Sequence, residues 1–432
     1  MTDLPRIHCP ALLVAAPASG QGKTTVVAAL ARLHTRLGRK VRVFKCGPDF
    51  LDPQIHAIAS GAPCQNIDLW MCGAADAAWR LAEAARESNL ILVEGVMGLY
   101  DGSPSAAELA VSLGLPILAV IAGAAMANSF GAIAYGLRNY RPGTPLNAAF
   151  ANRVGSPRHA AILEQSLPPE IAWYGHLPRE VDATLPERHL GLLPAAEIED
   201  LSQRIERMAD LLEPTAAANL PPAVSFSDLA RPELPPLLAG KTIAVARDAA
   251  FCFLYPANLD CLAALGAKIV HFSPLADCVL PACDAVWLPG GYPELHASAL
   301  AANRSLWDSL AAHVDAGKPA LAECGGMMAL FESLQGIDGV EHAMAGLLPG
   351  KVIMQKRLAG LGMQEVALPE GVLRGHAFHY SKTETAQSLL CTTTRPDGQP
   401  GEAVYRRNRL TASYMHLYFP FNPVVAARLF LK

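Results

Sequence analysis

The segment from Ala16 to Thr25 constrains the fold more than any other part of the chain. It follows an apolar run, residues 11–15, and precedes a helical pattern from Val26 to Leu37. A strand, a glycine loop and a helix in this order form a phosphate cradle, because backbone N–H groups and the helix N-terminus face the anion. The loop ends in Gly-Lys-Thr-Thr, as a P-loop does, although Ala16 stands where the first glycine of that pattern is expected. We therefore predict a nucleotide site rather than a glycine-rich turn with a solvated lysine.

The N-terminal half alternates short apolar runs with helical patterns, which predicts right-handed βαβ units and a mostly parallel sheet. The expected strands are residues 12–15, 41–45, 90–93, 117–121 and 146–151. Ligands of such sheets bind at the carboxyl ends of the strands. Asp49, Glu94 and Asn152 lie at the ends of three of these strands, so we expect them near the nucleotide.

An uncharged stretch from Leu109 to Leu137 could be mistaken for a membrane span. Gly114, Pro116 and Gly123 interrupt it in the manner of turns between a helix, a strand and a second helix. A buried parallel strand needs no polar alternation. We therefore expect this stretch to form the core of an α/β domain.

Length and composition predict a globular protein of two or three domains, because 432 residues exceed one ordinary core. The net charge of −4 gives no electrostatic reason to expect nucleic acid as a partner. The ten cysteines include no Cys-x-x-Cys pair, and the N-terminus lacks the pattern of a signal peptide. We expect reduced thiols, a cytoplasmic location and no membrane association.

Six prolines without helical or strand periodicity lie between Glu213 and Gly240, which predicts a semi-extended linker. We therefore expect one domain over residues 1–212, a linker over 213–240 and a second α/β domain over 241–432. Strands of the second domain are predicted at residues 242–246, 268–272 and 285–289.

The second domain contains a candidate nucleophile, Cys324, in a strand–turn–helix pattern with Gly326 just beyond it. A thiol on such an elbow is exposed, and we expect the helix N-terminus to lower its pKa. The backbone amides of Gly290 and Gly291 could form an oxyanion hole, and His416 could serve as the base. A buried structural thiol explains Cys324 alone, but the three features together favour catalysis.

Four other histidines receive simpler interpretations. We expect His34 and His313 at the surface. His376 and His379 could pair as metal ligands, but no third ligand with suitable spacing is apparent, so structural or substrate-contact roles are favoured.

Several stretches carry a resemblance to one family. They are Ser19–Thr25, Gly47–Phe50, Glu94–Gly102, Asn152–Ser156, Arg188–Leu192, Leu288–Glu294 and Glu323–Gly326. The chain resembles the cobyrinate a,c-diamide synthase family, in which a dethiobiotin-synthetase-like P-loop domain precedes a class I glutamine amidotransferase domain. One departure from typical glutaminases is Tyr418, two residues after His416, where many have glutamate. This leaves open which group orients the imidazole.

The resemblance implies amidation of the c and then the a acetate of cobyrinate, through an acyl phosphate and ammonia released from glutamine by Cys324 and His416. The same reaction on hydrogenobyrinate or a nickel sirohydrochlorin is an alternative, and cobyric acid synthase is a weaker one. From another class, a P-loop switch ATPase with a non-catalytic glutaminase-like module is disfavoured because Ala18 stands where such switches carry a second lysine. A biotin-pathway enzyme would leave Cys324 and the second domain unexplained.

The resemblance also implies roles for particular residues. The nucleotide is expected to contact Ser19, Gly20, Gln21, Gly22, Lys23, Thr24, Thr25 and, at the adenine, Asn152. Mg²⁺ is expected near Thr24, Asp49 and Glu94, with Asp101 organising the substrate or phosphate site. The expected partners are small molecules: the corrin, ATP and glutamine, with the ring in a groove between the domains. The resemblance allows a homodimer, although the sequence does not indicate the oligomeric state.

Overall fold

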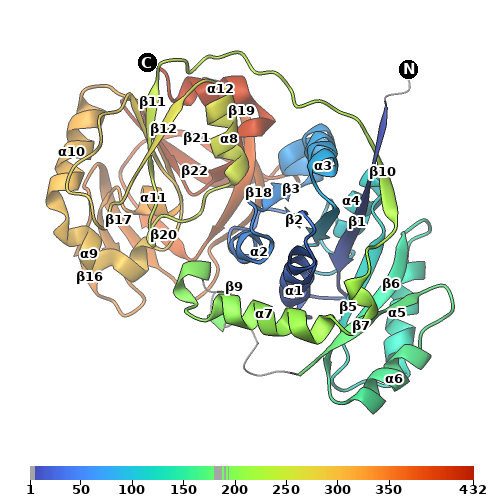
Figure 1. The fold of residues 1–432 in the computed structure, drawn as a ribbon. Helices are drawn as coiled ribbons and strands as arrows, with labels where there is room; N and C mark the ends of the chain where they lie inside the picture. Colours follow the sequence, from blue (N-terminus) through green and yellow to red (C-terminus); the bar gives the residue numbers. More distant parts are fainter. Residues whose placement is uncertain (1–4, 180–186, 189–190, 193) are drawn as a thin grey trace. The chain divides into compact units, whose positions relative to one another are not determined.

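The computed structural model describes residues 5–179, 187–188, 191–192 and 194–432. The chain forms two compact units, Met1–Arg231 and Pro232–Lys432, which are coloured blue to green and yellow to red in Figure 1. Each unit is an α/β structure with its own sheet and its own core.

The first unit contains a parallel sheet in the order β3-β2-β4-β1-β5-β6-β7. Its strands are β1 (Arg6–Ala15), β2 (Val41–Cys46), β3 (Gln65–Ile67), β4 (Leu90–Glu94), β5 (Ile117–Ala122), β6 (Leu146–Val154) and β7 (Ala172–Pro178). The five strands predicted from the sequence are therefore confirmed.

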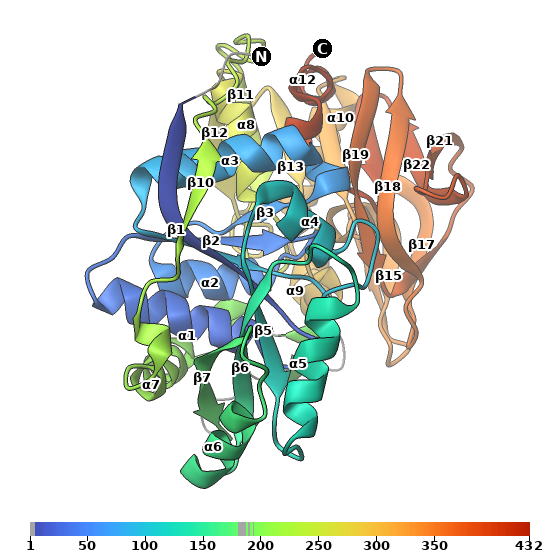
Figure 2. The same ribbon diagram turned by 90° about the vertical axis from the view of Figure 1, so that its right-hand side faces the viewer.

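Helices cover both faces of this sheet, as the turned view in Figure 2 shows. They are α1 (Lys23–Arg36), α2 (Asp52–Ser60), α3 (Ala74–Glu87), α4 (Ala106–Leu113), α5 (Ser129–Asn139), α6 (Pro157–Gln165) and α7 (Leu201–Leu212). Buried side chains of α1, α2 and α7 form one apolar cluster, and those of α3, α4, α5 and α6 form another on the opposite face. The uncharged stretch 109–137 spans the end of α4, all of β5 and most of α5, as predicted. Within the described part of the chain, every helix is too short or too polar to cross a membrane.

The segment predicted as a linker, residues 213–240, contains a strand that its proline content does not predict. Strand β10 (Ala223–Ser227) pairs antiparallel with β1, from Arg6 opposite Ser227 to Pro10 opposite Ala223. Its alternate residues Val224 and Phe226 are buried in the core of the first unit. The expectation of a segment without strands is therefore wrong for these five residues, because the N-terminal part of β1, which precedes its pairing with β4 and β5, offers them a hydrogen-bonding partner.

The second unit is built on a sheet in the order β12-β11-β13-β14-β23-β22-β21-β18-β19-β24. The first five strands are parallel: β12 (Lys268–Phe272), β11 (Thr242–Ala246), β13 (Ala285–Leu288), β14 (Ala320–Glu323) and β23 (Leu410–Ser413). The antiparallel part comprises β22 (Pro400–Arg407), β21 (Leu389–Thr394), β18 (Gly360–Leu368), β19 (Gly371–His379) and β24 (His416–Leu417).

The remaining elements of the second unit are a small sheet and short helices. The sheet comprises β16 (Glu341–Ala343), β15 (Phe331–Gln335), β17 (Leu348–Met354) and β20 (Ser381–Glu384). The helices are α8 (Pro256–Ala264), α9 (Ala297–Ala302), α10 (Arg304–Asp315), α11 (Gly325–Met328) and α12 (Pro423–Leu429).

Two histidines expected at the surface are buried. His34 is 1% exposed and His313 is 7% exposed. Burial, together with Arg39, lowers the pKa of His34 to about 4. His313 Nε2 lies 3.1 Å from the carbonyl oxygen of Pro319. Both predictions were wrong because a single polar residue on a helix does not reveal which helix face packs on the sheet. In the family-like stretch Arg188–Leu192, His189 and Leu190 lie outside the described residues.

Candidate active sites

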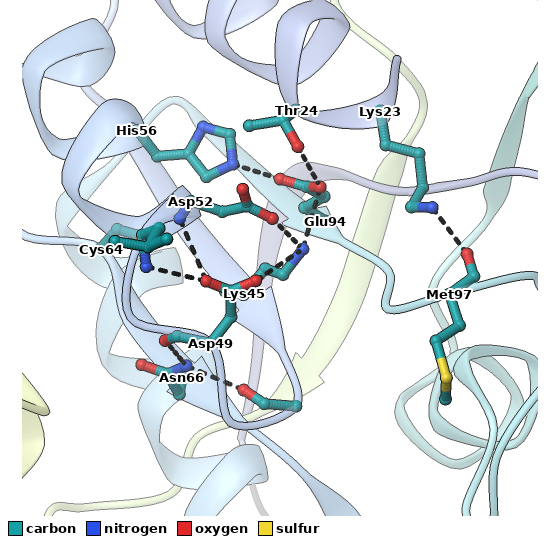
Figure 3. Close-up of polar contacts among 12 residues, drawn as sticks. Lys23, Thr24, Lys45, Asp49, Asp52, His56, Cys64, Asn66, Glu94 and Met97 are labelled. Carbon is teal, nitrogen blue, oxygen red and sulfur yellow. Dashed lines mark hydrogen bonds and ion pairs between the residues drawn. The ribbon is translucent and has the colours of Figure 1, made fainter. Parts of the chain in front are cut away.

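Glu94, at the end of β4, is the centre of a buried polar cluster in the first unit (Figure 3). Its Oε1 accepts hydrogen bonds from Thr24 Oγ1 and from Lys45 Nζ, both at 2.9 Å. Its Oε2 contacts His56 Nε2. Burial alone would raise the pKa of Glu94, but Lys45 and His56 together hold that pKa far below its usual range. Glu94 is therefore an ionised carboxylate at neutral pH.

Strand register explains why these side chains meet. Glu94 pairs with Val14 on β1 and with Lys45 on β2, so it lies between the strand that leads into the P-loop and its neighbour. Thr24 is the second residue of α1, and His56 lies in α2. The cluster thus forms at the carboxyl ends of parallel strands, where the sequence predicted a ligand site.

Lys45 connects three carboxylates. Its Nζ lies 2.5 Å from Asp52, 2.9 Å from Glu94 and 3.9 Å from Asp49. Burial opposes its charge, but these acids raise the pKa of Lys45 well above its usual value. Asp49 Oδ1 also accepts hydrogen bonds from the N–H groups of Leu51 and Asp52, which fixes the loop after β2.

Sequence reasoning missed Lys45, Asp52 and His56 as members of this cluster. A signal was available, because Lys45 and Asp52 flank Asp49 and His56 follows Asp52 by one helical turn.

The P-loop has the backbone that its glycines predict. Gly20 and Gly22 have positive φ values of 75° and 93°, which favour glycine, and α1 begins at Lys23. Lys23 Nζ donates to the carbonyl oxygen of Met97 at 2.6 Å. Burial lowers the pKa of Lys23, although Glu94 acts in the opposite direction.

Asn152 contacts the P-loop, and Asp101 fixes the loop that follows β4. Asn152 Nδ2 donates to the carbonyl oxygen of Gln21 at 2.9 Å, and a Cβ atom at Gly22 would lie 2.1 Å from that nitrogen. Asp101 Oδ2 accepts from the N–H of Gly98 at 3.0 Å, within the loop that follows β4. The adenine contact of Asn152 and the substrate-site role of Asp101 stay predictions.

The oxygen donors near the P-loop suit a magnesium ion that is held mainly by a nucleotide. Thr24, Asp49 and Glu94 offer one hydroxyl and two carboxylates, and hard oxygen ligands are those that Mg²⁺ prefers. Among the residues that the structure describes, no group of three His, Cys, Asp or Glu side chains could hold a metal ion by itself.

In the second unit, Cys324 lies on a tight turn between β14 and α11. Its φ of 45° is unusual for a non-glycine residue and marks a constrained backbone of the kind found at active sites. The N–H of Cys324 donates to the carbonyl oxygen of Ser413 at 2.8 Å. A Cβ atom at Gly326 would lie 2.2 Å from the carbonyl oxygen of Leu288, so the elbow requires a glycine there.

The structure brings the predicted base and oxyanion-hole residues to this elbow. A Cβ atom at Gly290 would lie 2.2 Å from His416 Cε1, so the imidazole packs directly on this glycine. A Cβ atom at Gly325 would lie 2.9 Å from the nitrogen of Gly291. Burial, together with His376 and His379, lowers the pKa of His416 to about 3. The imidazole is therefore neutral at pH 7 and can accept a proton.

The expected lowering of the thiol pKa of Cys324 is not found. Burial, with Glu294 in second place, raises that pKa well above its usual value. The helix that follows has only four residues, so its dipole is small. In this state the thiol of Cys324 is protonated and the imidazole of His416 is neutral.

A second polar group near the elbow was only partly expected. The His379 ring stacks on Tyr414 with ring centroids 3.6 Å apart, and its Nε2 lies 3.1 Å from Glu402. Tyr414 in turn accepts a hydrogen bond from Ser381 at 2.8 Å. Of these residues the sequence indicated only His379.

A P-loop unit followed by a Cys–His elbow unit defines a class of two-domain enzymes. Residues 12–193 match the CobQ/CobB/MinD/ParA nucleotide binding domain, and residues 242–423 match the CobB/CobQ-like glutamine amidotransferase domain. The chain is 57% identical over 423 residues to the hydrogenobyrinate a,c-diamide synthase of Stutzerimonas stutzeri, covering 98% of each chain.

Two further relatives agree with this match. The hydrogenobyrinate a,c-diamide synthase of Pseudomonas aeruginosa is 56% identical, covering 98% of this chain and 97% of the relative. The cobyrinate a,c-diamide synthase of Herminiimonas arsenicoxydans is 49% identical, covering 97% of this chain and 96% of the relative. The chain therefore belongs to the family of hydrogenobyrinate and cobyrinate a,c-diamide synthases.

Proposed function

We propose that this chain is an ATP- and glutamine-dependent amidoligase that amidates the c and then the a acetate of a corrin-ring acid. One observation carries the proposal: a single chain holds both a phosphate loop with an ionised Glu94 and a Cys324 elbow packed beside His416 and Gly290. The first arrangement suits carboxylate activation, and the second suits release of ammonia from glutamine.

The names of the relatives suggest two substrates. The relatives at 57% and 56% identity are named for hydrogenobyrinate, and the one at 49% is named for cobyrinate. Hydrogenobyrinate is therefore the favoured substrate of this chain, and cobyrinate is the second candidate. The family resemblance named cobyrinate first and left hydrogenobyrinate open as an alternative.

The first unit would activate the substrate carboxylate. A carboxylate is a poor electrophile, so one of its oxygens attacks the γ-phosphorus of ATP, ADP leaves, and an acyl phosphate forms. Ammonia then attacks the acyl carbon. The bond between that carbon and the phosphate oxygen breaks, and inorganic phosphate leaves with the electron pair. Loss of a proton then gives the amide. Lys23 and the loop amides would hold the phosphates in line. Mg²⁺, when bound with the nucleotide, would neutralise phosphate charge, and Thr24 with Asp49 or Glu94 would hold it.

The second unit would supply the ammonia. His416 accepts the thiol proton as Cys324 sulfur attacks the amide carbon of glutamine, and the N–H groups of Gly290 and Gly291 face the developing oxyanion. The proton then passes to the leaving nitrogen, ammonia departs, and water hydrolyses the thioester to glutamate. These reaction steps need a neutral His416 and a protonated Cys324 at the start.

The test is to incubate the full-length chain with MgATP and glutamine, separately with hydrogenobyrinate and with cobyrinate, and to follow mono- and diamide by mass spectrometry. Amidation of one ring only would identify the substrate. If neither ring is amidated, with glutamine or with ammonium chloride as the nitrogen donor, the proposal is contradicted. ATP hydrolysis without glutamine hydrolysis would instead favour a switch ATPase with a binding module.

A cytoplasmic location and a homodimer also stay proposals. None of the ten cysteines, all of which lie in the described part of the chain, belongs to a disulfide, which suits a reducing compartment.

A further inference from the structure

We propose that Glu323 is a positioning residue of the glutaminase site that sets His416 relative to Cys324. Glu323 directly precedes Cys324, and its Oε1 accepts a hydrogen bond at 2.9 Å from the N–H of Leu417, which directly follows His416. One side chain therefore connects the segment of the nucleophile with the segment of the base. The inference rests on the proposed glutaminase function.

The carboxyl group of Glu323 lies in apolar surroundings. Glu323 is 2% exposed, and its face of the sheet is packed with Trp287, Leu321 and Leu417. A buried carboxyl is unfavourable unless hydrogen bonds compensate, and an apolar side chain of similar volume would satisfy packing alone. Two donors oppose this effect: Leu417 N–H and Trp287 Nε1, the latter at 3.0 Å from Oε2. Burial is nevertheless the larger effect and raises the pKa of Glu323 to about 8.

The strand that carries His416 depends on side-chain hydrogen bonds. Strand β24 is two residues long and pairs only at Gly375 opposite Leu417 and His376 opposite His416 among the described residues. Glu323 holds the N–H of Leu417, and Asn258 Nδ2 donates to its carbonyl oxygen at 2.8 Å. Both backbone polar groups next to the base are thus fixed by side chains.

Many glutaminases carry a carboxylate two residues after the base, where this chain has Tyr418, so the carboxylate of Glu323 reaches the base by a different route. Here the carboxylate of Glu323 belongs to β14, the strand that leads to Cys324. It contacts the backbone N–H of Leu417, next to His416, and not the imidazole itself. Because the side chain is anchored one residue before Cys324, a shift of β14 would move both partners together. The distance between thiol and imidazole is therefore held against such motion.

The test compares three variants in the full-length chain. Glu323→Met removes both acceptors at similar volume, and a misplacement of about 1 Å costs roughly a hundredfold in rate. We expect kcat for glutamine hydrolysis to fall roughly tenfold to a hundredfold, with KM for glutamine little changed. Amidation driven by ammonium chloride should stay at the wild-type rate. Trp287→Phe is the matched comparison, because it removes the other donor and leaves the Leu417 bond. Its kcat for glutamine hydrolysis should therefore fall clearly less than that of Glu323→Met.

A double variant separates positioning from simple stability. Glu323→Gln offers one acceptor oxygen to two N–H donors, so one donor faces the amide NH₂ group. Trp287→Phe removes that conflict, and the double variant should regain kcat relative to Glu323→Gln. A merely structural role of Glu323 would change unfolding temperature and ammonium-driven amidation, but would not give this recovery of kcat.

A folded Glu323→Met variant with wild-type kcat, or with equal loss for glutamine and ammonium chloride, would overturn the inference. If Glu323→Met does not fold, lack of kcat recovery in the double variant overturns it instead. A wild-type chain that never hydrolyses glutamine would contradict the proposed function itself, which is a different outcome from normal turnover in the variants.

Discussion

The hydroxyl of Thr24 donates a 2.9 Å hydrogen bond to Glu94, although the two residues are 70 positions apart in the chain. The bond joins the first turn of α1 to the end of β4, and so joins the phosphate loop to the ionised acid. Lys45 and His56 hold the same carboxylate from the other side (Figure 3). The proposed Mg²⁺ and γ-phosphate positions therefore depend on one connected cluster.

The first prediction concerns this bond. Thr24→Ala should slow amidation with both glutamine and ammonium chloride by roughly tenfold to a hundredfold, because a hydrogen bond to a charged group contributes about 1.5–3 kcal/mol. Thr35→Ala on the same helix is the control, since that hydroxyl donates to the carbonyl oxygen of Ala31 within α1. Initial rates of amidation, measured with saturating ATP and each nitrogen donor, check this prediction. Equal rates for Thr24→Ala and Thr35→Ala would exclude a role for the Thr24 hydroxyl.

The second prediction concerns the charges of the site. Lys23→Ala and Glu94→Gln should each suppress amidation with either nitrogen donor by roughly a hundredfold or more, because each removes an interaction with developing phosphate charge or its counter-ion. Circular dichroism and intact glutamine hydrolysis would show that the variants are folded. Near-normal ammonium-driven turnover in either variant would remove that residue from the proposed machinery.

Site residues that belong to a motif or to a strand end could be predicted from the sequence, and residues placed by strand register or helix rotation were harder to predict. Thr24 and Glu94 could be predicted because a P-loop and a strand end place them at one sheet edge. Lys45 and His56 are harder to predict. Their spacing places them near Asp49 and Asp52, but their convergence on Glu94 depends on the register of β2 and the rotation of α2. The thiol pKa of Cys324 was predicted in the wrong direction because burial sums over many neighbours that sequence spacing does not show.

The third prediction separates the two reactions. Cys324→Ala should abolish glutamine-dependent amidation, and ammonium chloride should restore it, because Cys324 and Lys23 belong to different units. Cys261→Ala is a suitable control, since that thiol is also buried in the second unit but lies on α8. Loss with both nitrogen donors in folded Cys324→Ala would show that this division of labour is wrong.

The fourth prediction concerns pH. The pKa of His416 is about 3 in the folded chain, against an ordinary value near 6.5 that applies when it is unfolded. Below pH 6.5 the unfolded state binds a proton that the folded state does not, so stability is lost as pH falls from 6.5 toward 3. For this one group, the free energy of unfolding falls by up to about 1.4 kcal/mol for each unit by which the pH is lowered in this range. Urea titrations of wild type and His416→Gln at pH 5 and pH 7 should show a smaller pH effect in the variant. An identical pH effect in both proteins would contradict a buried neutral imidazole.

The last prediction is that the half-finished product leaves the enzyme, or at least reseats, between the two amidations. The sequence contains one phosphate-loop motif, so one carboxylate at a time can meet the γ-phosphate with reacting atoms about 3–3.5 Å apart. The c and a acetates project from different positions of a stiff macrocycle, so one pose cannot serve both. Because the ring must move, and because ADP and phosphate must also be exchanged, we expect a c-monoamide to accumulate in solution early in the time course. An excess of unlabelled monoamide should dilute label out of the diamide formed from labelled substrate. If the label instead passes wholly into diamide despite that excess, release is excluded and the ring reseats without dissociating.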